Sequence, residues 1–297
     1  MTGIALVPRR IAPITTDAHV VLYDGIVPDD VLKDVAFYVP PYTTSPEHMP
    51  LMARMPALQV CQLLTAGYEQ ALPHLPEGVI LCNAGGVHDA STAELAVALM
   101  LASIRGIDVA VRDMTTGTWN HVRRASLADR RVVIIGAGGV GNAIRVRLEA
   151  FEAFVTMVGR SARAGVESMD TLDQLLPSAE IVVLAVPLND TTRHLANAQF
   201  LAKLSDGALV VNVARGPVVD TDALIAETSS GRLMAALDVT DPEPLPSDHP
   251  LWSSPGVLIT PHVGGDSWAF EPRARHLVDA QLGRWHAGEP LRSVITR

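Results

Sequence analysis

The sequence RVVIIGAGGVGNAIRVRLEA, residues 131–150, decides the fold class. Apolar residues 132–135 run directly into the pattern G-x-G-x-x-G at residues 136–141, and a helical run follows at 142–150. A strand, a glycine turn and a helix in this order are typical of a turn that binds the pyrophosphate of a dinucleotide. The glycines allow a tight turn, close approach of the backbone to the phosphates and close packing of helix on strand. Free N–H groups at the helix start favour the phosphate charge.

Short apolar runs alternate with helical patterns on both sides of this stretch. The expected strands are residues 19–23, 35–39, 58–64, 79–82, 132–135, 154–158, 181–186, 208–213, 234–239 and 257–260. The expected helices are residues 28–33, 46–55, 90–104, 142–150 and 268–285. Strands separated by helices predict βαβ crossovers and parallel sheets, so the chain should form two α/β units.

The composition is that of a folded protein. Apolar residues make up 48% and charged residues 19%, which excludes an intrinsically disordered chain. Aromatic residues make up 4%, so the core must be mainly aliphatic, as in a parallel sheet covered by helices. The net charge of −9 and the absence of a long Lys/Arg run argue against a nucleic-acid partner.

The cysteines and the hydropathy of the chain indicate the cellular compartment of the protein. Cys61 and Cys82 lie in apolar runs, where buried thiols in a reducing compartment are the simplest interpretation. The sequence has no Cys/His cluster with metal-ligand spacing, so we expect no metal site. Residues 1–13 lack the apolar core of a signal peptide, and no run approaches the roughly 18 apolar residues of a membrane span. We therefore expect a cytoplasmic protein with no membrane partner.

The strand at residues 154–158 bears on the choice of cofactor. In NAD-binding units an acidic residue at this strand end holds the ribose 2′-hydroxyl. Here the strand runs into Gly159-Arg160-Ser161-Ala162-Arg163. A carboxylate would repel a 2′-phosphate, whereas Arg160, Ser161 and Arg163 would attract one. The sequence therefore favours NADP over NAD, and a simple solvated arginine loop remains the alternative.

Polar side chains follow three later strands, in NVARG (212–216), DVTDPEP (238–244) and TPHVGG (260–265). Ligands of open parallel sheets bind beyond the carboxyl ends of the strands. Arg215, Glu243 and His262 collected there could bind a carboxylate, orient an imidazole and exchange a proton. Each residue alone has a structural explanation, but together, downstream of a dinucleotide turn, they predict a catalytic site.

The motifs GAGGVG, NVARGPVVD, DVTDPEP and TPHVGG, in this order, resemble those of the D-isomer-specific 2-hydroxyacid dehydrogenase family. That family includes glyoxylate/hydroxypyruvate reductases, which the arginine turn resembles most, and phosphoglycerate dehydrogenases. The similarity extends from about residue 58 to residue 265. It implies an oxidoreductase that moves a hydride between NAD(P)H and a small 2-keto or 2-hydroxy acid.

The resemblance also implies an architecture. A Rossmann-type doubly wound parallel sheet, residues 94–266, would be inserted in a smaller flavodoxin-like α/β substrate domain, residues 1–93 plus 267–297. The active site would lie in the cleft. The protein would be a homodimer, with the arm at residues 112–131 and Trp119 at the interface.

Roles for single residues follow from the same resemblance. His262 would protonate the carbonyl oxygen as the hydride arrives, and Glu243 would hydrogen-bond to that imidazole and keep it protonated. Arg215 would bind the carboxylate and polarise the carbonyl, and the backbone of Ala66 and Gly67 would also receive the carboxylate. Cofactor contacts would come from Gly136, Gly138, Gly139, Val140, Gly141, Arg160, Ser161, Arg163, Val186, Pro187, Val213, Thr92 and Asp238, the last on the nicotinamide carboxamide.

The chain departs from the family pattern at two places. The loop at residues 65–69, TAGYE, lacks the aspartate that commonly stands two residues after the glycine. Trp268 is bulkier than usual and would either wall the pocket or pack a helix. Formate dehydrogenases have glutamine where Glu243 stands, so the carboxylate argues against them. A phosphoglycerate dehydrogenase-like NAD enzyme, or a non-catalytic dinucleotide sensor like the corepressors of this family, remains open.

Overall fold

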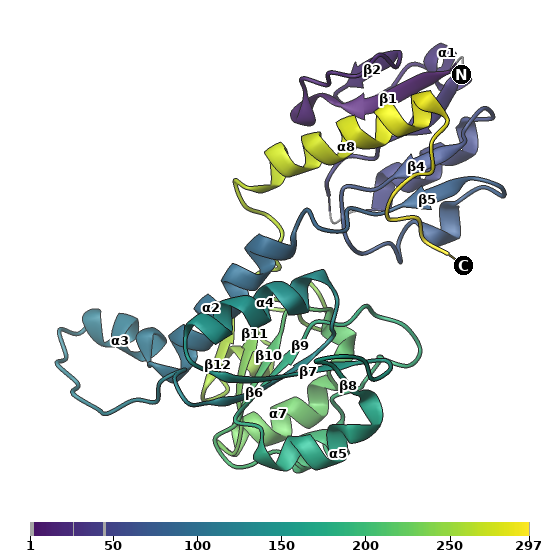
Figure 1. Cartoon of the computed structure of the whole chain (residues 1–297). Coiled ribbons are helices and arrows are strands. Elements are labelled where there is room, and N and C mark those ends of the chain that lie inside the picture. Colours follow the sequence, from purple (N-terminus) through teal and green to yellow (C-terminus); the bar gives the residue numbers. More distant parts are fainter. Residues whose placement is uncertain (1–2, 26, 44–45, 297) are drawn as a thin grey trace. The chain divides into compact units, whose positions relative to one another are not determined.

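The computed structural model describes residues 3–25, 27–43 and 46–296. The chain divides into two units, Met1–His88 with Ser267–Arg297, and Asp89–Asp266 (Figure 1). It thus leaves the first unit after His88 and returns to it at Ser267. Among the described residues, no helix is both long and apolar enough to cross a membrane.

The first unit is built on a five-stranded parallel sheet with the order β2-β1-β3-β4-β5. Its elements are β1 (Ile4–Pro8), β2 (Val20–Tyr23), α1 (Asp29–Leu32), β3 (Val35–Tyr38), β4 (Val60–Gln62), β5 (Ile80–Cys82), α8 (Phe270–Ala287) and 3-10 helices at Arg9–Ile11, Pro46–Arg54 and Leu72–His74. This strand order is that of flavodoxin-like sheets and confirms the predicted class of the unit.

Two local predictions for this unit are wrong. The strand β1 lies inside the unit's sheet, between β2 and β3, and was not expected, although its residues 5–8 are buried. Residues 46–55 were expected to be α-helical, but Pro46–Arg54 is a 3-10 helix. Pro50 lies inside this segment and has no N–H for an α-helical hydrogen bond, which favours the irregular form.

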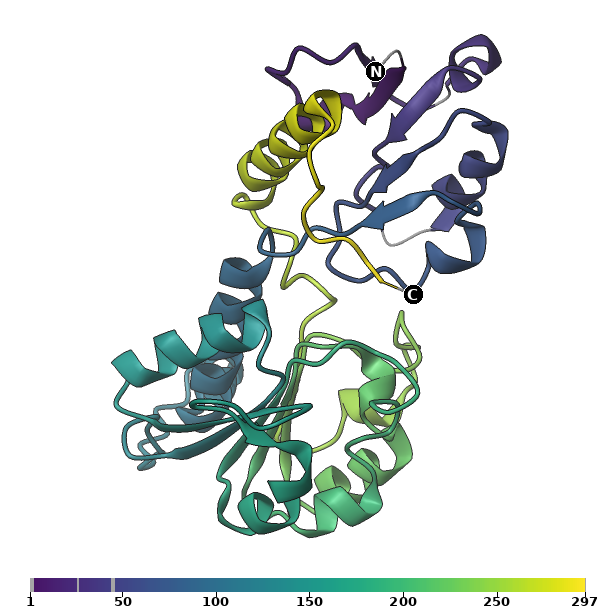
Figure 2. The same ribbon diagram turned by 45° about the vertical axis from the view of Figure 1, so that its right-hand side comes forward.

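Helices cover both faces of the first sheet (Figure 2). On one face α8 buries a stripe of Phe270, Ala274, Val278, Leu282 and Trp285 against the strands, at the spacing of a helix with a single apolar side. Leu32 of α1 and the methionines of the 3-10 helix pack on the other face. The strands are therefore buried on both sides, which explains their continuous apolar runs.

The second unit contains a seven-stranded parallel sheet with the order β12-β11-β10-β9-β6-β7-β8. Its elements are α2 (Asp89–Ile104), α3 (Ile107–Met114), β6 (Arg131–Ile135), α4 (Gly139–Ala150), β7 (Phe154–Gly159), β8 (Glu167–Ser168), α5 (Leu172–Leu175), β9 (Ile181–Leu184), α6 (Ala198–Ala202), β10 (Leu209–Asn212), α7 (Thr221–Ser229), β11 (Met234–Leu237), β12 (Val257–Ile259) and 3-10 helices at Met169–Thr171, Leu176–Ser178, Gly216–Val218 and Pro250–Trp252. The order reverses between β6 and β9, which is the Rossmann topology that residues 131–150 predicted.

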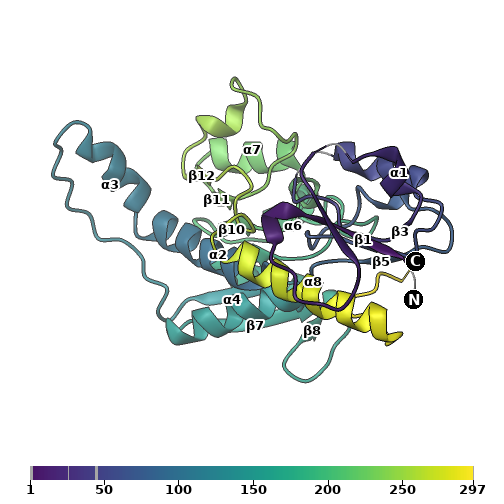
Figure 3. The ribbon, with the colours of Figure 1, turned by 90° about the horizontal axis from the view of Figure 1, so that it is seen from above.

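The segment after α2 extends away from this sheet (Figures 1 and 3). Gly106, with a backbone φ of +64°, ends α2 and begins α3, a helix that the sequence did not predict. Between α3 and β6 the chain has no helix or strand. Residues 107–124 therefore form a projecting arm, whereas Leu127 is back in the core of the unit, and Trp119 on the arm is 95% exposed.

Candidate active site

The glycine turn lies between β6 and α4, at the point where the strand order reverses. A Cβ atom on Gly136 would lie 2.2 Å from the carbonyl oxygen of Ala185, and one on Gly141 would lie 1.8 Å from that of Gly136. Packing therefore requires both glycines. Gly138 differs, because a Cβ there would meet no atom within 4 Å. Its bare backbone faces open space beside the first turn of α4, which fits the approach of a dinucleotide pyrophosphate.

Two arginines follow β7 at the neighbouring strand end. Arg160 is exposed, whereas the Nη2 group of Arg163 donates a hydrogen bond of 2.9 Å to the carbonyl oxygen of Ala137 in the glycine turn. The positive charge of Arg163 thus lies next to the glycine turn. No acidic residue stands at this strand end, since β7 closes on Gly159. The site is therefore electropositive where a ribose 2′-substituent would lie in a Rossmann unit.

His262 and Glu243 meet at the carboxyl edge of the same sheet. The imidazole Nδ1 of His262 lies 2.5 Å from Oε1 of Glu243, and each side chain is about one-third exposed (34% and 36%). His262 follows β12, whereas Glu243 follows β11, which is its neighbour in the sheet. With Nδ1 held by the carboxylate, Nε2 is the ring nitrogen left to exchange a proton.

The backbone of His262 is held in an unusual conformation. Its φ is +54°, in the left-handed region that few non-glycine residues adopt. Asp238, which is 3% exposed, accepts hydrogen bonds from Thr260 Oγ1 (2.7 Å) and from the backbone N–H groups of Val263 and Gly264 (2.9 Å each). The Asp238 carbonyl also accepts from the His262 N–H at 2.8 Å. Asp238 therefore fixes the loop that presents the imidazole.

Arg215 is positioned in a similar way. The side chain of Asn212, at the end of β10, accepts a hydrogen bond from the Ala214 N–H (3.0 Å) and donates one to the carbonyl oxygen of Arg215 (2.9 Å). A Cβ atom on Gly216 would lie 1.9 Å from the carbonyl oxygen of Thr240, so the loops after β10 and β11 touch. Three loops from adjacent strands thus gather Arg215, Glu243 and His262, as the sequence predicted.

The surroundings favour the ionised form of Glu243. Burial alone would raise the pKa of this carboxyl, but the His262 hydrogen bond and charge, a backbone hydrogen bond at Thr240 and the charge of Arg215 together hold the pKa below its ordinary value. Glu243 is therefore ionised at neutral pH, with the imidazole of His262 hydrogen-bonded to it.

The remaining predicted residues lie in two places. Val186, Pro187 and Val213 follow β9 and β10 at the carboxyl edge, and a Cβ on Gly264 would lie 3.4 Å from the methyl group of Thr92. Ala66 and Gly67 lie in the first unit, in the loop between β4 and β5. Among the described residues, neither of their N–H groups donates a hydrogen bond to the protein.

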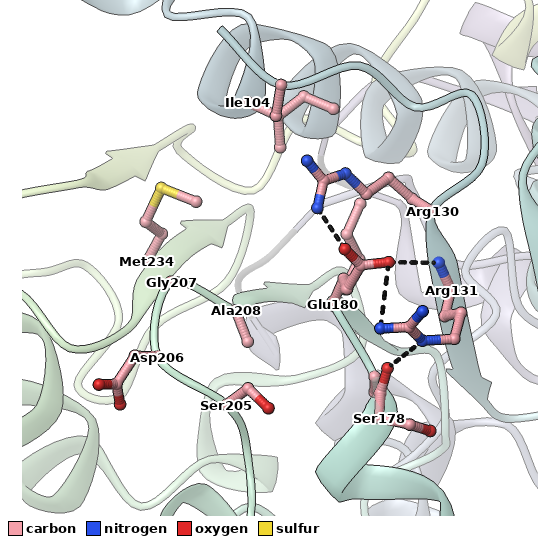
Figure 4. A pocket seen from close by; sticks show the side chains of 13 residues that line it. Ile104, Arg130, Arg131, Ser178, Glu180, Ser205, Asp206, Gly207, Ala208 and Met234 are labelled. Atoms are coloured by element: carbon pink, nitrogen blue, oxygen red, sulfur yellow. Dashed lines mark hydrogen bonds and ion pairs between the residues drawn. The ribbon is translucent and has the colours of Figure 1, made fainter.

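A surface pocket lies elsewhere in the second unit (Figure 4). It is at the amino ends of the strands, beside Arg130, Arg131 and Glu180. Arg130 pairs with Glu180, which also accepts from the Arg131 N–H at 3.0 Å, and Arg131 Nε donates to the Ser178 carbonyl. The bonds to Glu180 join β6 to β9. Glu180 is engaged by both arginines, so we assign the pocket a structural role.

The family model for the D-isomer specific 2-hydroxyacid dehydrogenase NAD binding domain matches residues 97–264. The chain belongs to this family. Residues 97–264 therefore form its NAD-binding domain, within the second unit. The family relationship accounts for the Rossmann strand order and for the glycine turn at the switch point.

Named relatives agree with this assignment. A glyoxylate reductase of Thermofilum pendens is 33% identical over 242 residues, which cover 76% of this chain and 70% of that protein. A D-isomer specific 2-hydroxyacid dehydrogenase from Xanthobacter autotrophicus Py2, solved with NADPH and MES, is 29% identical with a TM-score of 0.82, covering 100% of this chain and 98% of that one. An NADPH-dependent glyoxylate/hydroxypyruvate reductase from Sinorhizobium meliloti, solved with NADP and sulfate, is 26% identical with a TM-score of 0.84, covering 99% and 98%. The chain is thus an oxidoreductase that transfers a hydride between a nicotinamide dinucleotide and a small 2-keto or 2-hydroxy acid.

Sequence reasoning missed the residues that position this site. Asn212, Thr240 and Thr260 lie in the motifs but received no role. Thr240 Oγ1 donates to the Pro242 carbonyl at 2.9 Å, just before Glu243. The available signal was a Thr or Asn beside each strand end, since such side chains readily bond to nearby backbone.

Proposed function

We propose that this chain is an NADPH-preferring reductase of small 2-keto acids, with glyoxylate and hydroxypyruvate as its first candidate substrates. The observation that carries the proposal is the His262–Glu243 pair, 2.5 Å apart, at the sheet edge that also bears the glycine turn. A bare dinucleotide turn would serve a sensor equally well. An imidazole held at Nδ1 by an ionised carboxylate is suited to proton transfer.

When bound, a reduced nicotinamide cofactor would supply the hydride for C2 of the keto acid. His262 donates a proton from Nε2 to the carbonyl oxygen, so that the product is the neutral alcohol. Glu243 stabilises the imidazolium before the transfer and fixes its orientation. Arg215 provides positive charge for the substrate carboxylate and for the oxygen as negative charge develops. In the first unit, the N–H groups of Ala66 and Gly67 receive the carboxylate.

The cofactor would be held by the remaining predicted residues. Gly138 leaves room for the pyrophosphate at the start of α4, which includes Gly139 and Val140. Arg163, anchored on the turn, and Arg160 with Ser161 would bind the 2′-phosphate of NADP. The NADPH and NADP in the two solved relatives support this preference. Asp238 and Thr92 would lie next to the nicotinamide.

The decisive experiment is a panel of 2-keto acids assayed at 340 nm with NADPH and with NADH. We expect reduction of glyoxylate or hydroxypyruvate, with NADPH preferred. Better use of NADH, together with oxidation of 3-phosphoglycerate, would instead support the phosphoglycerate dehydrogenase alternative. Binding of NADPH with no turnover of any acid would support the dinucleotide sensor.

Cofactor choice can be tested at Arg163. We expect Arg163→Ala to weaken NADPH binding about ten- to a hundred-fold in a fluorescence titration and NADH binding much less, because the 2′-phosphate contact is made by NADPH alone, whereas loss of the hydrogen bond to Ala137 affects both dinucleotides. Arg193→Ala, an arginine outside the proposed cofactor contacts, is the control. Equal losses for both dinucleotides would place Arg163 on the pyrophosphate or on the turn itself instead.

We also propose that the protein is a homodimer joined through the projecting arm. The arm exposes Val111 (57%), Met114 (78%) and Trp119 (95%), an apolar set unusual for a surface facing water. Light scattering after gel filtration should give a dimer, and Met114→Ser with Trp119→Ser should give a monomer. Phe154→Ser removes an exposed apolar side chain elsewhere and should leave the dimer intact. A monomeric wild type at micromolar concentration would refute the proposal.

A further inference from the structure

The loop Thr65–Gly67 is held by hydrogen bonds to the segment after β5. Asn83 Nδ2 donates to the carbonyl oxygen of Ala66 at 2.7 Å, and the Ala84 N–H donates to that of Thr65 at 2.8 Å. Thr65 Oγ1 in turn donates to the carbonyl oxygen of Gly67 at 2.7 Å. These bonds engage the carbonyl groups of the loop, whereas the N–H groups of Ala66 and Gly67 donate to no described residue and stay available to a ligand.

Asn83 is itself held by the chain that follows α8. Its N–H donates to the Ser293 carbonyl at 3.1 Å, and the Ile295 N–H donates to the Leu81 carbonyl at 2.8 Å. Val294 pairs antiparallel with Cys82, so this segment lies along the outer edge of β5 (Figure 2). The last part of the described chain thus supports the loop through Asn83.

A buried pair of amides connects this segment to the sheet. Gln62 of β4 and Gln281 of α8 are both 0% exposed, and Gln281 Nε2 donates to Gln62 Oε1 at 2.8 Å. Gln281 also accepts from the Arg292 N–H (2.9 Å) and donates to the Arg292 carbonyl (3.0 Å). Gln62 Nε2 donates to the Asn83 carbonyl at 3.0 Å. Gln62 thus holds the Asn83 carbonyl directly, and Gln281 holds the segment whose Ser293 carbonyl accepts from the Asn83 N–H.

These contacts form a connected polar network inside the first unit. Buried amides with partners on every side order their neighbours, because breaking one bond leaves a buried polar group without a partner. Plain packing would need only apolar residues at positions 62 and 281, between an apolar helix and an apolar sheet. The two glutamines instead connect the segment after α8 to a loop with free N–H groups.

We propose that Gln281, Asn83 and the segment Arg292–Ile295 are positioning elements for substrate binding, which set the carboxylate-receiving N–H groups of the loop Thr65–Gly67. The inference rests on the proposed function of that loop. Residues after α8, which are more than two hundred positions from the loop in sequence, would thus control the affinity for the keto acid. They act through Asn83 and do not touch the substrate.

Two variants test the network at its ends. Asn83→Asp keeps the acceptor for the Gly85 N–H but removes the donor to Ala66, and Asn83 is only partly buried, so folding should survive. Gln281→Met keeps the volume and removes the distal amide. We expect each to raise KM for the keto acid roughly fivefold, the effect of one ordinary hydrogen bond, with kcat and the NADPH dissociation constant unchanged.

Hydrogen exchange provides a readout independent of turnover. The Ala84 N–H is protected by the Thr65 carbonyl, so its exchange reports the order of the loop. Both variants should accelerate it several-fold. Glu289→Gln alters the same segment but only at an exposed ion pair with Arg284, and should change neither quantity.

Each result has a distinct meaning. Faster exchange at Ala84 with a raised KM supports the proposal. Unchanged exchange at Ala84 in a folded Gln281→Met or Asn83→Asp protein overturns it, whatever the kinetics. Faster exchange with an unchanged KM shows that the network orders the loop but that the loop does not bind the keto acid, which overturns the proposed function of Ala66 and Gly67.

Discussion

The two edges of the seven-stranded sheet carry similar numbers of charged groups but use them differently. At the amino edge, Arg130, Arg131 and Glu180 satisfy one another across β6 and β9 and line a pocket (Figure 4). At the carboxyl edge, His262, whose backbone φ is positive, meets Glu243, and each side chain is about one-third exposed. A pocket thus lies at the amino edge and the proposed catalytic pair at the carboxyl edge.

The comparison shows that a concave surface is a weaker sign of function than a group held in a costly conformation. Ordinary ion pairs at a sheet end need no special backbone. A non-glycine residue with positive φ costs free energy, which surrounding hydrogen bonds must offset. Asp238 and Thr260 provide those bonds, so the protein uses buried polar groups to present one imidazole.

The largest expected effect tests whether the carboxyl edge does the chemistry. His262→Ala should lower kcat about a hundred-fold or more, because general acid catalysis is lost. NADPH affinity, measured by fluorescence titration, should stay the same, since the glycine turn is untouched. Near-normal turnover would mean that another residue donates the proton.

A second change tests the charge on Glu243. Burial alone would raise the pKa of this carboxyl, but the hydrogen bond and charge of His262 help to hold it below its ordinary value, so Glu243 is ionised at neutral pH. Glu243→Gln removes that charge from beside His262, so we expect the pH–rate profile of keto-acid reduction to shift to lower pH than in wild type. On the alkaline limb the rate should fall by about tenfold. Superimposable pH–rate profiles would show that Glu243 only orients the ring.

A third change tests how Asp238 and Thr260 hold the loop that presents His262. Thr260→Val keeps the shape but removes the hydrogen bond to Asp238, so kcat should fall roughly fivefold as the imidazole loses its alignment. Thr260→Ser retains the hydroxyl and should act like wild type. Equal rates for the two variants would show that the bond contributes only to stability.

The smallest kinetic effect is expected at the amino edge. Glu180→Gln should leave kcat and KM unchanged and lower the free energy of unfolding by about 1 kcal/mol at neutral pH, since partial exposure screens the charges. Burial raises the pKa of Glu180, but the Arg131 N–H and the two guanidinium groups outweigh it and lower the pKa below its ordinary value. A carboxyl with a lowered folded pKa stabilises above its unfolded pKa and loses that contribution as pH falls through the folded value.

The stability difference between wild type and Glu180→Gln should therefore disappear in that acidic range, as denaturant titration at several pH values would show. A loss of activity at neutral pH would instead give the amino-edge pocket a functional role. Either outcome shows whether the amino edge has a structural or a functional role.

Much of the fold could be predicted from the sequence, because the spacing of apolar residues and the residues that form turns are local features. Residues 131–150 predicted the Rossmann unit, and every expected strand overlaps an observed one. The strand β1 was not predicted, because its five residues, ending in Pro8, resemble an irregular extended segment until their neighbours β2 and β3 are known. The helix α3 was not predicted, although Ile107, Val111 and Met114 recur at helical spacing, because it is short, exposed and packed on no core.

The candidate site was less readable. Strand-end motifs predicted that Arg215, Glu243 and His262 would gather, and adjacent strands bring them together. The positive φ of His262 and the contacts of Asp238 depend on strand order and loop closure, which no local pattern contains. The support of the loop Thr65–Gly67 by residues after α8 depends on contacts more than two hundred positions apart in the sequence, such as Gln62–Gln281.

The return of α8 to the first unit has a consequence for the order of folding during synthesis. Residues Met1–His88 leave the ribosome first, but one face of their sheet is covered only when Phe270–Ala287 has been made. The second unit is continuous in sequence and can complete its core earlier. Because domains fold as units and the chain grows at about 5–20 residues per second, the strands of the first unit wait roughly ten seconds or more for α8. During that interval the five strands have an uncovered apolar face, which is a target for chaperones.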